Sequence, residues 1–136
     1  MSFDLVVYIK HPLSEMIDIW EQRLIEIDET AYFDSQAKEE IKQNREFSGW
    51  FPVGDQGFEL YIQDVMDEEI SDPAAPPQIA NTRYALTISM SNDHLRKGYF
   101  CAGALALVNE GVILDTYEGT YLSPEQAIII GREMPE

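Results

Sequence analysis

The sequence predicts an α+β fold, namely a single two-layer domain with a mostly antiparallel sheet and helices on one face. Three observations lead to this prediction. The chain has 136 residues, the usual size of one domain. Its composition is 45% hydrophobic and 11% aromatic, which is enough to pack a core. Segments of alternating and of helical periodicity follow one another in the order β-α-α-β-β-β-α-β-α. We therefore expect residues 1–136 to form one domain.

The N-terminal part contains one expected strand and two expected helices. Residues 3–10 are rich in Val, Ile and Tyr and stop before a proline, which predicts a strand. Residues 13–27 place apolar side chains at helical spacing and acids on the opposite side, which is typical of a helix that covers a sheet. Residues 34–44 predict a short, peripheral helix with Asp34 or Ser35 as its N-cap.

The central part predicts three strands and a long loop. Residues 47–53 and 58–63 flank the glycines of GDQG, and the simplest interpretation is a hairpin. Residues 67–81 are acidic and rich in proline, which cannot continue a β-ladder, so we expect an exposed, mobile loop there. Residues 83–90 alternate strictly and predict a strand with one face toward the core and the other toward solvent or a partner.

The C-terminal part predicts a helix, a short strand and a second helix. Residues 93–108 follow several capping residues and are rich in small side chains, which favours a helix packed closely on the sheet. Gly111 ends that helix, and residues 111–115 predict a short strand. Ser123 is followed by a proline and, at the capping-box position, by a glutamine, so a final helix should start there and run through Ile130.

Composition also indicates the cellular setting and the class of partner. The net charge is −16 and only nine residues are Lys or Arg, which argues against binding nucleic acid or an anionic membrane and favours a basic partner. No apolar run approaches the roughly 18 residues of a membrane span. The N-terminus has Asp4 and no basic leader, and Cys101 is the only cysteine, so we expect a bacterial, cytoplasmic protein.

The sequence lacks the patterns expected for a metal, a cofactor or a catalytic group. Cys101 and His94 are seven residues apart on one expected helix, which separates them by about 10.5 Å, too far for a nucleophile and its base. His11 is the only other histidine, so no zinc spacing exists, and the acidic segment lacks the alternating acids and glycine of a calcium loop. No glycine motif has phosphate-loop spacing. We predict no cofactor, no metal site and no identifiable catalytic set.

Two groups of residues are candidates for binding. The first is a run of acids without Lys or Arg, which would attract a basic partner: Asp64, Asp67, Glu68, Glu69 and Asp72. The second lies in the hairpin, where Trp50, Glu59 and Tyr61 are the best available lining for a pocket. The alternative for the second group is that its aromatic side chains belong to the core and that Glu59 is a solvated residue of the outer face.

The C-terminal third carries a weak family resemblance. A short strand that ends in Asp115 and a Ser-Pro-Glu-Gln helix start over residues 122–127 resemble small acidic uncharacterised bacterial α+β proteins, a type often found among toxin-immunity proteins. The resemblance implies a binding role and transfers no functional residue. We expect a non-enzymatic, immunity-like domain that binds a basic protein through an acidic surface. The alternative is a small-molecule-binding protein or enzyme with a pocket beside the 47–63 hairpin; the oligomeric state stays open.

Overall fold

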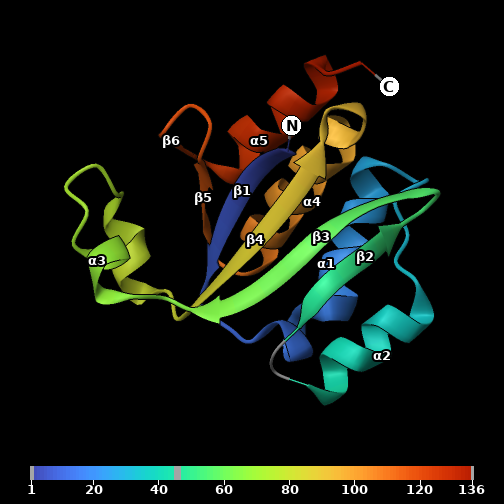
Figure 1. Cartoon of the computed structure of the whole chain (residues 1–136), viewed down its shortest axis with the longest axis horizontal. Coiled ribbons are helices and arrows are strands. Elements are labelled where there is room, and N and C mark those ends of the chain that lie inside the picture. Colours follow the sequence, from blue (N-terminus) through green and yellow to red (C-terminus); the bar gives the residue numbers. More distant parts are fainter. Residues whose placement is uncertain (1, 45–46, 136) are drawn as a thin grey trace.

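The strands form one six-stranded antiparallel sheet in the order β2-β3-β4-β1-β5-β6 (Figure 1). This computed structural model describes residues 2–44 and 47–135. The strands are β1 (Ser2–Ile9), β2 (Ser48–Val53), β3 (Gln56–Asp64), β4 (Tyr84–Ser91), β5 (Val112–Asp115) and β6 (Thr120–Leu122). The predicted hairpin corresponds to β2 and β3, and the first strand lies in the middle of the sheet beside β4 and β5.

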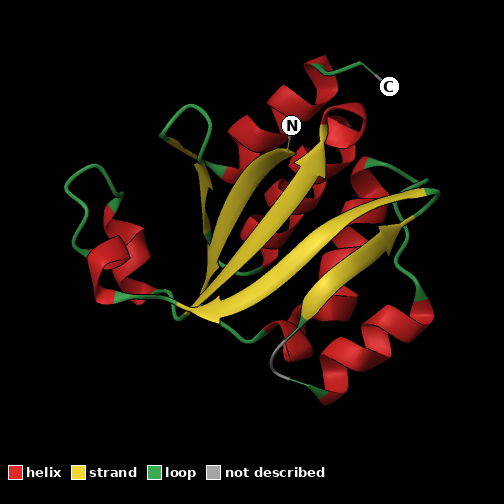
Figure 2. Cartoon of the chain, viewed as in Figure 1, coloured by secondary structure: helices red, strands yellow, loops and turns green. Residues whose placement is uncertain are grey.

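Four helices cover one face of the sheet, as predicted for an α+β domain (Figure 2). They are α1 (Leu13–Ile27), α2 (Ser35–Gln43), α4 (Leu95–Val108) and α5 (Pro124–Glu133). A single turn, α3 (Asp67–Ile70), and the 3-10 helix η1 (Pro77–Asn81) belong to a segment on the opposite face, and a second 3-10 helix, η2 (Asn92–His94), precedes α4. Figure 1 shows α3 apart from the helical layer.

The main core lies between α4 and the sheet. Alternate residues of β1, such as Leu5 and Val7, are buried and point toward the helices. The middle of α4 is buried on all sides, because α1, α5 and β1 all contact it. Its small residues allow this, as predicted: a Cβ added at Gly103 would lie 2.7 Å from the Cγ1 atom of Ile128 in α5. The short separation means that α5 packs directly on the α4 backbone.

Trp20 connects α1 to α4 and to the hairpin. Its side chain is fully buried, and its indole N–H donates a hydrogen bond to the backbone carbonyl of Cys101 at 2.9 Å. The ring of Phe33 contacts it edge-on at 4.6 Å between centroids, and the ring of Phe51 in β2 is parallel to it at 5.8 Å. The aromatic cluster therefore joins elements that are distant in the sequence. The buried indole N–H is satisfied by the carbonyl of α4.

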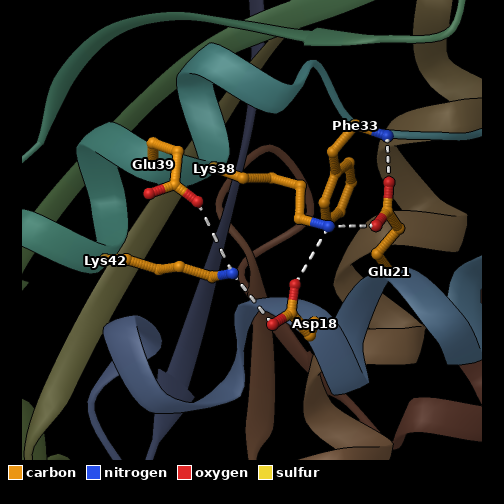
Figure 3. A network of polar contacts seen from close by, with 6 residues as sticks. All are labelled: Asp18, Glu21, Phe33, Lys38, Glu39 and Lys42. Carbon is orange, nitrogen blue, oxygen red and sulfur yellow. Dashed lines mark hydrogen bonds and ion pairs between the residues drawn. The ribbon is translucent and has the colours of Figure 1, made fainter.

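A network of ion pairs holds the peripheral helix α2 against α1 (Figure 3). Lys38 of α2 lies 2.9 Å from Asp18 and also pairs with Glu21, both on α1. Glu21 in turn accepts the backbone N–H of Phe33 at 2.7 Å. Lys38 and Glu21 are mostly buried, so their attraction is screened less by water than that of an exposed pair. The ion pairs add to the few apolar contacts of this helix, whose buried side chains are Ala37 and Ile41.

The helix starts follow the predictions at two of three positions. Asp34 caps α2 by accepting the N–H of Ala37, and Ser123 caps α5 in a capping box with Gln126. Before α4 the expected caps form η2 instead, and no side chain caps that helix.

Two further segments contain regular structure that the sequence patterns did not predict. Residues 120–122, just before Ser123, form the short strand β6, which pairs with β5. Segment 67–81, expected to be a simple exposed loop, contains α3 and η1 and buries Ile79. The acidic and proline-rich composition indicated polarity there but did not reveal the apolar contact.

Replacing Trp20 with alanine should remove the largest buried contact between α1 and the rest of the core. We expect Trp20→Ala to lower the free energy of unfolding by about 3–5 kcal/mol. Urea denaturation followed by circular dichroism measures this change. The control is Ile19→Ala on the same helix, whose side chain is 48% exposed and should contribute about 0.5 kcal/mol or less. Equal losses for the two variants would contradict the placement of Trp20.

Replacing Ser123 with alanine should weaken the start of α5. The Ser123 side chain accepts the N–H of Gln126 at 3.1 Å, and its loss leaves that donor without its cap. We expect Ser123→Ala to cost about 0.5–2 kcal/mol in thermal or urea unfolding. Ser35→Ala is the matched control, because Asp34 and not Ser35 caps α2. A cost no larger than that of Ser35→Ala would show that the capping box contributes nothing.

Candidate functional site

The face of the sheet opposite the four helices carries the hairpin residues singled out from the sequence. Trp50 on β2 lies directly across from Glu59 on β3, and Glu59 lies across from Ser89 on β4. Ser89 in turn lies across from Asp4 on β1, so the four residues form one row over four strands. Tyr61 is two residues beyond Glu59 and shares its face. We call this surface the open face.

Trp50 and Tyr61 are exposed on the open face, whereas their aromatic neighbours are buried. Trp50 is 53% exposed and Tyr61 is 36% exposed, but Phe51 and Phe58 belong to the core. The Trp50 ring lies over Gly57, where an added Cβ would approach the indole to 2.7 Å. A glycine at this position therefore lets the indole lie close to the sheet. The structure places Trp50, Glu59 and Tyr61 on one face of the hairpin, and none of the three lines the hollows of about 800 and 280 Å³.

Asp4 adds a carboxylate to the open face that the sequence analysis did not assign to a site. One of its carboxylate oxygens, Oδ1, is buried and has no hydrogen-bond partner among the described residues. Its backbone carbonyl accepts the Thr116 hydroxyl at 2.8 Å, which fixes the strand beside β5. An acid between Phe3 and Leu5 in an apolar strand was the available signal, because a buried carboxylate oxygen without a donor is costly.

Residues 65–82 cover another part of the open face, and we call this segment the strap. Its Ile79 is buried and packs with Tyr8 of β1 and Ala85 of β4. The Tyr121 hydroxyl donates a hydrogen bond to Asp72 at 2.9 Å, and the Tyr8 hydroxyl is hydrogen-bonded to Glu69. The strap is therefore attached to the sheet by the buried Ile79, by the partly buried Val65 and Ala75, and by two tyrosine–carboxylate pairs.

The five acids predicted to bind a partner differ in their exposure. Asp64 ends β3, and it is exposed together with Asp67 and Glu68. Glu69 and Asp72 are half-buried instead, and they accept the tyrosine hydrogen bonds. Among the described residues, no partner is found for the carboxylates of the exposed three. The sequence does not reveal this difference, because tyrosines far away in the chain supply the hydroxyl groups.

A third tyrosine–carboxylate pair lies on the helical side of the sheet. Asp115 at the end of β5 is buried, and it accepts the Tyr99 hydroxyl of α4 at 2.9 Å. Its other oxygen accepts the backbone N–H groups of Tyr117 and Glu118 in the following turn. These hydrogen bonds satisfy both oxygens of Asp115, so its role is to support the turn rather than to act on a ligand.

A hollow of about 800 Å³ lies between the end of α1, the β2–β3 turn and the start of α4. Lys97 is the mostly buried cation of its wall, and its ammonium group donates to the Thr30 hydroxyl at 2.9 Å and lies 3.8 Å from Asp28. Burial opposes ionisation of Asp28, but the Thr30 hydrogen bonds and the charge of Lys97 lower the pKa of Asp28 overall. Lys97 and Asp28 thus stabilise each other.

The residues around the hollow do not form a nucleophile–base pair. His94 lines the hollow, whereas Cys101 is fully buried about two helical turns further along the chain, in α4. Burial raises the pKa of the Cys101 thiol, which opposes formation of the nucleophilic thiolate. A smaller hollow of about 280 Å³ lies between the strap and the start of α5, and Pro76, Tyr121 and Pro124 are among its lining residues.

Residues 2–44 and 47–135 contain no group of three or more His, Cys, Asp or Glu side chains arranged to hold a metal ion. None of their helices combines the length and the apolar character needed to cross a membrane.

The chain matches no protein-family model, no curated protein and no solved structure. The resemblance of its C-terminal third to small acidic uncharacterised bacterial α+β proteins, a type often found among toxin-immunity proteins, therefore stays a prediction.

The tyrosine pairs predict a loss of stability at alkaline pH. Burial, and then the hydrogen bond to Asp72, raises the pKa of Tyr121 to about 12, and burial also raises the pKa of Tyr8 and Tyr99. Above pH 10, the ordinary tyrosine value, the unfolded chain releases these protons first, so the free energy of unfolding falls with rising pH. Below pH 10 these groups do not change the free energy of unfolding, because they are protonated in both the folded and the unfolded chain.

Urea unfolding at several pH values from 8 to about 12 measures this dependence. The variant Tyr121→Phe removes one of the three groups, so its stability should fall less steeply with pH than that of the wild type. A wild-type stability that stayed constant up to pH 12, the value to which Tyr121 is raised, would contradict the assignment.

Proposed function

We propose that this chain is a non-enzymatic protein-binding domain that binds a basic protein partner on its open face. The observation that carries the proposal is the exposure of Trp50 and Tyr61 beside Glu59, on the side of the sheet that the four helices leave uncovered. Exposed tryptophan and tyrosine on a flat surface are the side chains that most often contribute large shares of binding energy in interfaces.

The chemistry of the row favours an arginine or lysine from the partner. Trp50 and Glu59 are cross-strand neighbours, so their Cβ atoms lie about 5 Å apart. A guanidinium group can stack on an indole ring while it donates hydrogen bonds to a carboxylate.

The distribution of charge supports a basic partner. No Lys or Arg occurs between Asp55 and Thr82, a stretch that includes β3 and most of the strap. Several cations of the remaining chain are paired with acids: Lys10 with Glu110, Lys38 and Lys42 with Asp18, and Lys97 with Asp28. Arg83 adjoins this stretch, because its backbone carbonyl accepts the N–H of Val65, but the exposed acids Asp64, Asp67 and Glu68 outnumber it there. Their negative field speeds the encounter with a positively charged partner.

An immunity-like role is the biological form of this proposal. An immunity protein has to bind a toxin tightly through a preformed surface, and an acidic surface suits a basic toxin. The support consists of the charge and the resemblance of the C-terminal third to acidic bacterial proteins of that type. A neighbouring toxin gene would add independent support.

The second candidate function is binding of a small molecule, with or without catalysis. The hollow of about 800 Å³ favours it, because its size falls within the range of ligand pockets. Its wall residues, such as Tyr32 and Lys97, differ from those of the open face, so substitutions can separate the two functions.

The test begins with capture of partners from a lysate of the source organism at low salt, followed by affinity measurements with the purified partner. We expect Trp50→Ala and Glu59→Gln each to weaken binding by about 10–100-fold, the effect of losing roughly 1.4–2.8 kcal/mol at a central contact. Tyr32→Ala is the matched aromatic control, since Tyr32 is 55% exposed and lies at the hollow.

The double variant Asp67→Asn, Glu68→Gln tests the electrostatic part. It should mainly slow association and flatten its salt dependence, with Glu125→Gln on α5 as the control. If Tyr32→Ala abolished binding while Trp50→Ala and Glu59→Gln left it intact, the hollow and not the open face would be the binding site.

A further inference from the structure

The strap conceals a part of the open face that is continuous with the proposed binding surface. Tyr61 lies across from Thr87, and Thr87 lies across from Val6. Val6 belongs to the small apolar cluster beneath the strap, together with the buried Tyr8 and Ala85. The exposed aromatic residues and the covered apolar patch are therefore neighbouring parts of one surface.

The strap is held by few interactions compared with the rest of the fold. Its described helices are a single turn, α3, and the 3-10 helix η1, and Ile79 is its only large buried side chain. The hydroxyl of the buried Thr82 donates to the carbonyl of Ile79 inside the same segment and thus adds no connection to the sheet. Segments with so little apolar burial open locally at a lower free energy than the whole domain unfolds.

The closed strap also occupies two carboxylates that a basic partner would use. Glu69 accepts hydrogen bonds from Tyr8 and from the backbone N–H of Met66. Asp72 accepts the Tyr121 hydroxyl and the backbone N–H of Ala74. Opening of the strap would break both tyrosine bonds, release both carboxylates and uncover the apolar patch at the same time.

We propose that the strap is a detachable cover that regulates access of the basic partner to the open face. This inference rests on the proposed function. The closed form presents Trp50, Glu59 and Tyr61 together with the exposed acids of the strap. The open form adds the patch around Tyr8 and the carboxylates that the two tyrosines held. A basic partner with an apolar side chain binds only the open form and shifts the population toward it.

The affinity for the partner and the hydrogen exchange of the strap both depend on the population of the open form. While the open form is a minor state, the apparent affinity of a ligand that binds only that form rises in proportion to the open population. Hydrogen exchange of the strap amides measures the same population, because these amides exchange when the strap opens. A substitution that loosens the strap should therefore change both quantities by the same factor.

The first experiment measures strap opening without any partner. Ile79→Ala and the double variant Tyr8→Phe, Tyr121→Phe should speed hydrogen exchange in residues 65–82. For Ile79→Ala we expect about tenfold or more, because the loss of a buried isoleucine exceeds the cost that corresponds to a factor of ten. Ile41→Ala is the matched control: it removes an equally buried isoleucine from α2 and should leave strap exchange unchanged. If strap amides exchanged only with global unfolding in all variants, the proposal would be wrong.

The second experiment measures binding with a defined probe, a fluorescently labelled peptide of arginines with one central leucine, at low salt. Ile79→Ala should bind this peptide more tightly by the factor by which its strap exchange increases, and Ile41→Ala should bind as the wild type does. Faster exchange without tighter binding would overturn the regulatory role while leaving the open face as the binding surface. If Trp50→Ala and Glu59→Gln left the affinity for the peptide unchanged, this result would instead count against the proposed function itself.

Discussion

The burial of α4 is the constraint on which the rest of the structure depends. This helix lies between the sheet and its helical neighbours, and its middle portion has no side exposed to water. Such a position requires small residues, since α5 packs against the backbone at Gly103. It also requires polar groups at the ends of α4 to be satisfied from outside: the buried Asn109 side chain hydrogen-bonds with the backbone of Lys10 and His11. The segment that follows β1 is thereby attached to the C-terminal end of α4.

As a consequence, the two faces of the sheet are covered to different extents. The core helices all pack on one side, because α4 occupies the centre of that side and α1 and α5 pack against α4. The strap covers only part of the other side. Trp50 and Tyr61 remain accessible there although both belong to a hairpin whose alternate aromatics, Phe51 and Phe58, are core residues. The open face is thus a rigid surface supported by the core beneath it, which suits binding without rearrangement of the strands.

The abundant carboxylates serve three different physical purposes. Some neutralise cations within the helical layer, as Asp18 and Glu21 do with Lys38, and others accept tyrosine hydroxyls, as Asp72 and Asp115 do. The remaining acids, such as Asp67 and Glu68, have exposed side chains and carry the long-range field. Net charge alone does not distinguish these purposes. Only the partner of each carboxylate reveals whether it stabilises the fold or is available to another molecule.

Local patterns in the sequence determined most elements of this protein. The periodicity of residues 13–27 and 83–90, the capping residues Asp34 and Ser123, and the small residues of α4 each act over one or a few turns, so their effects can be predicted without knowledge of the fold. They were sufficient for the fold class and for placing Trp50, Glu59 and Tyr61 on candidate strands. Tertiary structure alone decided which of these side chains remain accessible and which acids are occupied. Asp72 and Tyr121 are 49 residues apart, and Trp20 and Cys101 are 81 apart. Contacts over such separations depend on strand order and register, which no short segment specifies by itself.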